Sequence, residues 1–126
     1  MKEIINTKEA PQPIGPYNQA VSAGGFLFIS GQIAIDPSTE KLVTEEIEAE
    51  THLVLKNLKA ILTEAGLTFE HIVKTTIFLS DMNNFGIVNE IYGSYFTGNF
   101  PARETVEVSV LPKNVNVEIS AIAVKA

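Results

Sequence analysis

Arg103 is the residue of this sequence with the most distinctive chemistry, because it is the only arginine. The other permanently charged basic side chains are eight lysines. A guanidinium group grips a carboxylate or a phosphate through two parallel hydrogen bonds, which a lysine ammonium cannot imitate. Arg103 follows Phe100-Pro101-Ala102 and directly precedes an alternating stretch over residues 105–110. Two interpretations follow: Arg103 forms a structural ion pair, or it binds an anionic ligand.

Three further polar residues complete a candidate site. Glu118 lies in a predicted strand, Asn89 lies on the apolar stripe of a predicted helix, and Tyr17 closes a proline-stiffened loop. Each alone has an ordinary explanation: a glutamate facing solvent, an amide satisfied in the core, or a tyrosine that packs its ring. Together with Arg103 they supply an anion-binding fork, a proton-transfer carboxylate and two neutral hydrogen-bonding groups. That set suits proton transfer on a small carboxylate substrate.

Composition and missing motifs exclude several other functions. The net charge is −6 and the lysines are scattered, which argues against a nucleic-acid partner. There is no cysteine, so disulfides, zinc–thiolate sites and thiol nucleophiles are excluded. The sequence has no HExxH, GxGxxG or P-loop motif, and His52 and His71 are expected at the surface rather than in a Ser-His-Asp set. We therefore expect no metal and no cofactor.

The N-terminal residues lack the apolar segment of a signal peptide. The longest apolar stretch, over residues 20–35, is interrupted by glycine and polar residues and is too short to span a bilayer. We therefore expect a cytoplasmic protein without membrane contact.

Periodicity and turn residues predict one domain over residues 1–126 with the element order β-β-β-α-β-α-β-β. The helices are predicted over 44–65, with Thr44 as the N-cap and Gly66 as the C-terminal signal, and over 81–96. Gly24-Gly25 predicts a tight hairpin. Strands are predicted over 3–5, 20–23, 26–35, 72–79, 103–110 and 115–124. This order predicts an α+β sandwich with two helices on one face of a mixed sheet.

The last predicted strand carries apolar residues on both of its faces. One face holds Val117, Ile119 and Ala121, and the other includes Ile122 and Val124. The two helices are enough to cover only one face of the sheet. We therefore expect the second face to be buried by oligomerisation.

Several motifs are distributed over nearly the whole chain. They are Ile14-Gly15-Pro16-Tyr17, Phe28-Ile29-Ser30-Gly31-Gln32, Asn89 with Tyr92 and Tyr95-Phe96, Pro101-Ala102-Arg103, Leu111-Pro112-Lys113, and Val117-Glu118-Ile119 with Ala121-Ile122-Ala123. In these motifs the sequence resembles the RidA/YjgF family of reactive-intermediate (enamine/imine) deaminases. The resemblance implies a chorismate-mutase-like fold and a homotrimer with active sites between subunits. We expect Arg103 and Asn89 of one cleft to come from different subunits or to lie at their boundary.

The resemblance also implies an activity and roles for individual residues. The activity is that of a 2-iminobutanoate/2-iminopropanoate deaminase, which hydrolyses 2-aminoacrylate-type enamines and imines from pyridoxal-phosphate enzymes to 2-keto acids and ammonia. On the matching positions, Arg103 binds the substrate carboxylate, Glu118 activates water and shuttles protons, and Tyr17 hydrogen-bonds substrate or water. Further substrate-binding positions are Asn89, Ser30, Gly31 and the backbone of Thr105.

One departure and one alternative accompany this interpretation. The chain has Glu104-Thr105 where many relatives carry Ser-Cys, so Glu104 is expected to place a negative charge beside the cleft. The alternative function is a non-catalytic protein that binds 2-keto acids or similar small metabolites. Arg103 and Tyr17 serve both functions, whereas Glu118 within reach of a water molecule serves only the enzyme.

Overall fold

In the computed structural model, which describes residues 1–125, the first half of the sheet is organised by the hairpin at Gly24-Gly25. Both glycines have positive φ, +59° and +83°, the conformation that a two-residue hairpin loop requires. They join strand β2 (Ala20–Ala23) to strand β3 (Phe26–Gln32), and β1 (Glu3–Ile5) pairs antiparallel with the other edge of β2. The predicted hairpin is therefore confirmed.

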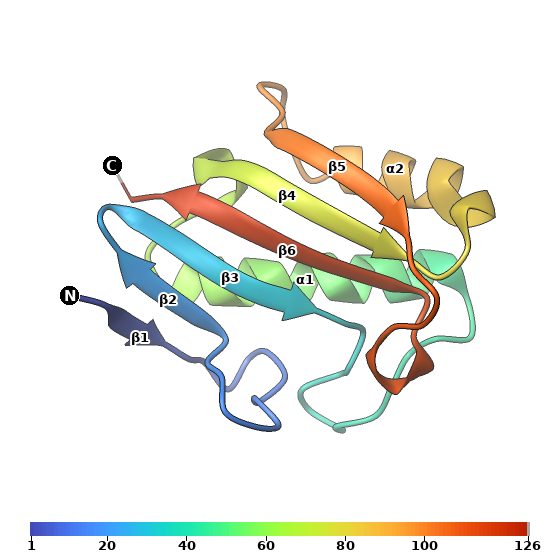
Figure 1. The fold of residues 1–126 in the computed structure, drawn as a ribbon, viewed down its shortest axis with the longest axis horizontal. Coiled ribbons are helices and arrows are strands. Elements are labelled where there is room, and N and C mark those ends of the chain that lie inside the picture. The colour runs from blue at the N-terminus through green and yellow to red at the C-terminus, as the bar shows by residue number, and fades with distance from the viewer. Residues whose placement is uncertain (126) are drawn as a thin grey trace.

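The six strands form one sheet in the order β1-β2-β3-β6-β4-β5. Strands β4 (Ile72–Leu79) and β5 (Ala102–Glu107) run parallel, and β6 (Val117–Val124) runs antiparallel between β3 and β4. Helices α1 (Ile47–Glu64) and α2 (Phe85–Gly93) lie on the same face of this sheet (Figure 1). The predicted α+β class, element order and mixed sheet are confirmed.

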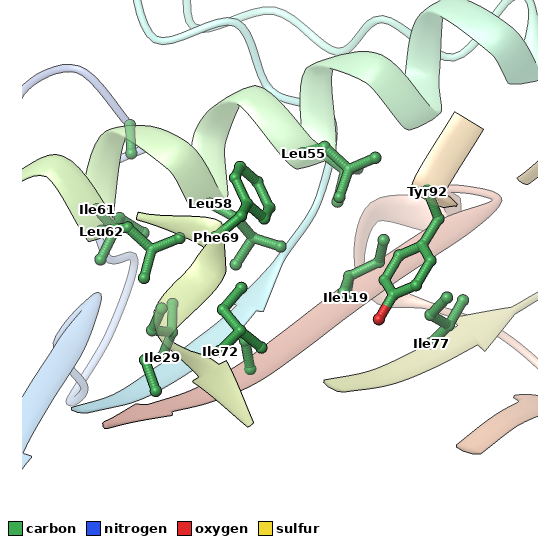
Figure 2. Close-up of a cluster of buried hydrophobic side chains, with 14 of the residues drawn as sticks. Ile29, Leu55, Leu58, Ile61, Leu62, Phe69, Ile72, Ile77, Tyr92 and Ile119 are labelled. Atoms are coloured by element: carbon green, nitrogen blue, oxygen red, sulfur yellow. The ribbon is translucent and has the colours of Figure 1, made fainter. Parts of the chain in front are cut away.

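The core lies between α1 and the helix-facing side chains of the strands (Figure 2). Leu55, Leu58, Ile61 and Leu62 of α1 are fully buried. The last three belong to the apolar stripe of helical period that the sequence has at residues 47, 54, 58, 61, 62 and 65. Burying a large apolar side chain contributes about 1.5–3 kcal/mol, so this layer accounts for much of the stability. The helix ends where Gly66 adopts φ +76° and the Leu67 N–H bonds the Leu62 carbonyl, so Gly66 acts as the predicted stop signal.

The opposite face of the sheet carries apolar side chains that no helix covers. Along β6, Val117 and Ile119 are buried against the helices, whereas Ile122 and Val124 on the alternate face are only partly buried. Phe26 and Phe28 of β3 are 42% and 45% exposed, and their ring centroids are 6.1 Å apart. The predicted two-faced apolar pattern of β6 is thus present. We call this uncovered side the open face.

Helix α1 begins at Ile47, so the predicted start and cap at Thr44 are wrong. The Val43 N–H bonds the Ala34 carbonyl and Leu42 pairs with Ile35, which keeps the chain extended just before this point. Glu46 occupies the N-cap position without a side-chain hydrogen bond. The strand predicted over residues 26–35 also ends early, at residue 32. Beyond it, the carbonyls of Ile33 and Ile35 accept hydrogen bonds from Asn57 Nδ2 of α1.

Three other elements have bounds that differ from the prediction. Helix α2 covers 85–93 instead of 81–96, because Asp81 caps a separate 3-10 turn over 82–84. Strand β5 ends at residue 107 instead of 110, where its partner β4 also ends. Strand β6 begins at residue 117 instead of 115, because the 3-10 turn before it has positive φ at Lys113 and Asn114. Within residues 1–125, neither helix is long and apolar enough to cross a membrane.

Candidate functional site

Arg103 lies on the helix-facing side of β5, beside α2. Its position follows from the parallel register, which places it opposite Thr75 of β4, a residue whose side chain is buried under α2. The Arg103 Nη1 donates a 2.7 Å hydrogen bond to Asn89 Oδ1. The guanidinium carbon lies 5.6 Å from the Phe85 ring centroid and 5.1 Å from that of Tyr92, distances typical of cation–π contacts.

These contacts leave the guanidinium available to a ligand. Among residues 1–125, the two ion pairs are Lys74–Glu104 and Lys125–Glu3, so Arg103 has no carboxylate partner within the described chain. The ion-pair interpretation of Arg103 is therefore not supported. Because the Asn89 oxygen faces Arg103, its amide nitrogen is directed elsewhere as a further donor. Asn89, Tyr92, Phe100 and Arg103 line one cavity, which presents donors suited to an anion.

Glu118 lies in a different cavity, of about 480 Å³, together with Tyr17, Ser30 and Gly31. Burial raises the pKa of Glu118, and no cation or hydrogen-bond donor of residues 1–125 pairs with its carboxylate. Ser30 donates its hydroxyl proton to the Asn18 carbonyl at 2.7 Å, which leaves its oxygen as an acceptor. A half-buried carboxylate with a raised pKa is suited to accept and return a proton.

The structure brings the predicted residues together as two separate groups. Arg103 points to the helix side of the sheet, whereas Glu118 alternates with the buried Val117 and Ile119 and therefore points to the open face. Strand β4 also separates their strands (Figure 1). A small substrate therefore cannot touch both side chains in one chain. Arg103 and Asn89 are hydrogen-bonded within one chain, which does not support the first alternative, that they come from different subunits. The second alternative, that both lie at a subunit boundary, stays a prediction.

Comparison with known proteins gives one consistent family. The family model described as Endoribonuclease L-PSP matches residues 7–125. A crystal structure of a Rid family protein, YyfA from Yersinia pestis, superposes with a TM-score of 0.96 at 54% identity and covers 98% of this chain and 99% of that one. The chain belongs to the RidA/YjgF family.

Two other Rid relatives carry functional information in their names. A mouse protein named 2-iminobutanoate/2-iminopropanoate deaminase is 49% identical over 125 residues, covering 99% of this chain and 93% of its own length. The Escherichia coli protein TdcF, whose crystal structure contains bound serine, has a TM-score of 0.94 at 42% identity and covers 98% of this chain and 99% of its own. Deaminases are therefore among the close relatives of this Rid protein.

In this Rid protein, the Glu118 carboxylate lies so close to residue 31 that only a glycine fits there without moving it. A methyl group added at Gly31 would lie 2.8 Å from Glu118 Cδ and still closer to Oε2. The carboxylate therefore rests directly against the Gly31 backbone. Gly31 lies within the register shift between β3 and β6, which turns this part of β3 toward the cavity.

If Glu118 transfers protons as the sequence predicts, Gly31→Ala should move its carboxylate and lower activity by roughly 10- to 100-fold, because small misplacements of a reacting group are costly. Stability should change little, since the displaced atoms are the mobile end of a side chain and Gly31 does not have positive φ. Steady-state kinetics and thermal melting measure both quantities. Gly86→Ala is the matched control, because a methyl group there meets nothing within 4 Å. Wild-type activity in Gly31→Ala would show that the Glu118 position is unimportant.

Sequence reasoning missed Glu50, which supports the Glu118 strand. Glu50 is fully buried on α1 and accepts hydrogen bonds from Asn116 N and Nδ2, both at 2.7 Å. It also accepts a bond from Val117 N at 3.3 Å, so a carboxylate of α1 fixes the residues just before Glu118. The available signal was spacing, because Glu50 lies between Ile47 and Val54 on the apolar stripe of the helix.

Other predicted features of the site are placed differently by the structure. The Glu104 side chain points to the open face, away from the Arg103 side chain, and there it accepts a hydrogen bond from Thr76 and pairs with Lys74 at 3.2 Å. These partners lower the pKa of Glu104. Thr105 lines neither cavity, and its buried Oγ1 has no hydrogen-bond partner among residues 1–125. The role expected for the Thr105 backbone stays a prediction.

The two histidines are less exposed than the sequence suggested. His52 of α1 is partly buried, and its Nδ1 lies 2.8 Å from the hydroxyl of Tyr95, which follows the end of α2. The His71 ring accepts a hydrogen bond from Thr68 N at 3.0 Å and so completes the cap of a short 3-10 turn. Neither histidine lines the cavities of Arg103 or Glu118. Both have structural contacts that account for their positions.

Proposed function

We propose that this protein is a 2-iminobutanoate/2-iminopropanoate deaminase that hydrolyses reactive enamine and imine intermediates to 2-keto acids and ammonia. The observation that carries the proposal is that two groups open into cavities without an oppositely charged partner among residues 1–125, the Arg103 guanidinium and the Glu118 carboxylate. These are the groups that a small imino acid needs for binding and for proton transfer. The mouse relative that is named for this activity supports the proposal.

In the proposed reaction, the Arg103 fork binds the substrate carboxylate, with Asn89 as a further hydrogen-bond donor. An enamine substrate first tautomerises to its imine. A water molecule then adds to the imine carbon, the electron pair of the C=N bond moves to nitrogen, and the water proton passes to Glu118. Glu118 returns this proton to the nitrogen, which gives a neutral carbinolamine. The Glu118 carboxylate then takes the carbinolamine hydroxyl proton and passes it to the amine nitrogen, the C–N bond breaks as the C=O bond forms, and ammonia leaves. Tyr17 hydrogen-bonds substrate or water.

We further propose that the reacting groups meet between subunits of a homotrimer of about 41 kDa, three chains of 13.7 kDa. Arg103 and Glu118 are on opposite sides of the sheet in one chain, so a complete site needs the Arg103 of one subunit and the Glu118 of another. The exposed Phe26 and Phe28 on the open face favour the same assembly, because a second copy would remove them from water. A monomer in light scattering at micromolar concentration would contradict this proposal.

The alternative functions make different demands. A binding protein for 2-keto acids would use Arg103 and would not need a carboxylate with a raised pKa in the neighbouring cavity. A ribonuclease, which the family description names, would need phosphate contacts along its substrate. With one arginine, scattered lysines and a net charge of −6, the chain is poorly suited to that role.

The direct test is the release of ammonia from freshly generated 2-iminopropanoate in the presence and absence of the protein. We expect the protein to accelerate ammonia and pyruvate formation clearly above the spontaneous reaction. Early time points are needed because these substrates hydrolyse rapidly on their own. If pyruvate binds but hydrolysis matches buffer alone, the protein is a binding module and the deaminase proposal is wrong.

A further inference from the structure

The aromatic support of Arg103 is itself anchored to the strand beside it. The Tyr92 ring, on which the guanidinium rests, is 3% exposed, and its hydroxyl lies 2.7 Å from the hydroxyl of Thr75. Thr75 is 1% exposed and is the residue opposite Arg103 in the β4–β5 register. Buried hydroxyl groups require a partner, so this pair is confined to one arrangement.

The helix presents its supporting residues on one face. Phe85, Asn89 and Tyr92 are separated by four and three positions, which places them in a row beneath Arg103. The rings of Phe85 and Tyr92 contact the guanidinium, and Asn89 accepts a hydrogen bond from its Nη1. Of these three residues, Tyr92 hydrogen-bonds through its hydroxyl to Thr75, the β4 residue that is paired with Arg103. The Thr75–Tyr92 bond therefore fixes the ring relative to the backbone from which the guanidinium extends.

We infer that Tyr92, held by Thr75, is a positioning residue that sets the orientation of the Arg103 fork for the substrate carboxylate. The inference rests on the proposed function for the identity of the ligand, a 2-imino or 2-keto acid. A bidentate contact requires the plane of the guanidinium to be oriented toward the carboxylate. If the Tyr92 ring beneath it shifts, the orientation of that plane changes. Loss of the anchor should therefore weaken carboxylate binding and leave the proton-transfer step of Glu118 intact.

The test uses two substitutions that remove one hydroxyl each and keep the shape of the side chain. Tyr92→Phe and Thr75→Val should each weaken pyruvate binding, measured by calorimetry on the assembled protein, by about three- to tenfold. The KM for 2-iminopropanoate should rise in parallel, while kcat stays within about twofold. The reason is that the substrate carboxylate is bound equally strongly in the ground state and in the transition state. The double variant should bind pyruvate no more weakly than the weaker single variant, since both substitutions remove the same bond.

Tyr95→Phe is the matched control, because the Tyr95 hydroxyl bonds His52 and Tyr95 does not contact Arg103. It should change the melting temperature without changing pyruvate binding. Unchanged pyruvate affinity in Tyr92→Phe with a lowered melting temperature would overturn the inference and leave a packing role only. If the losses of pyruvate affinity in the two single variants multiply in the double variant, the inference is also overturned. Binding is measured separately from turnover, so a wild type that binds pyruvate without turnover refutes the deaminase proposal but leaves this inference testable.

Discussion

Glu118→Gln is expected to bind pyruvate normally and to lose most of the imine hydrolysis above the spontaneous reaction. The amide keeps the size of the side chain but cannot accept the proton of the attacking water. General acid–base catalysis typically contributes about 10²–10⁴-fold, so a loss of that order is expected in kcat. A dehydrogenase-coupled assay of 2-keto acid formation, with imine generated in place, measures the rate against buffer. Glu64→Gln, an exposed position at the end of α1, is the control.

The pH profile gives a second measurement of the same residue. Burial raises the pKa of Glu118 above its ordinary value of 4.5, and the carboxylate must be deprotonated to act as a base. Activity should therefore fall as the pH drops through the raised pKa, at a higher pH than an exposed glutamate would give. The Gln variant should lack this acid limb. Equal and clearly catalysed rates in both proteins would remove Glu118 from the mechanism and leave water activation to Tyr17 or the backbone.

Arg103→Ala is expected to lower kcat/KM by roughly ten- to a few-hundredfold, because the substrate carboxylate loses its charge-assisted, bidentate contact. Arg103→Lys should recover little of this loss, since an ammonium group lacks the fork geometry. Both variants should remain folded, because Arg103 has no carboxylate partner in the described chain whose charge would be left unpaired. Pyruvate affinity and thermal melting measure the two effects. If Arg103→Ala unfolds the protein, the arginine has a structural role instead.

Mixing the two impaired variants tests whether a site is shared between subunits. In assemblies refolded from Arg103→Ala and Glu118→Gln chains, some interfaces combine an intact Arg103 from one subunit with an intact Glu118 from its neighbour. We expect partial recovery of imine hydrolysis in the mixture and none in either variant refolded alone. Absence of recovery in stable mixed assemblies would contradict the shared site, because it would require both groups to act within one chain.

The features that the sequence predicted correctly depend on short-range interactions. Gly24-Gly25 predicted the hairpin because two adjacent residues with positive φ are a local requirement. The stripe of α1 and the alternation of β6 predicted buried faces because side-chain direction follows the helix or strand period. Gly66 predicted the end of α1 for the same local reason. The residues of the candidate site were proposed from residue type and from the motifs that resemble the Rid family, and their roles stay predictions.

The sequence could not predict how the site residues divide between the two faces of the sheet. In β5, Arg103 and Thr105 point to one face of the sheet, and Glu104 and Val106 point to the other. Polarity alone suggests that the apolar Val106 faces the helices. The structure has the reverse, with Val106 41% exposed on the open face and Arg103 on the helix side. A shift of one residue in the β4–β5 pairing would exchange these faces, and that register depends on contacts distant in sequence.

The supporting contacts are likewise a result of tertiary structure. Glu50 lies 66 positions from Asn116, and Thr75 lies 17 from Tyr92, so no local pattern joins either pair. The sequence by itself therefore indicated the order of the elements, much of the core and the chemical groups proposed for the site. Tertiary structure decided that Arg103 and Glu118 belong to opposite sides of one chain, because only the folded sheet fixes register and faces. That separation is the physical reason why a complete site requires a second subunit in the proposed function.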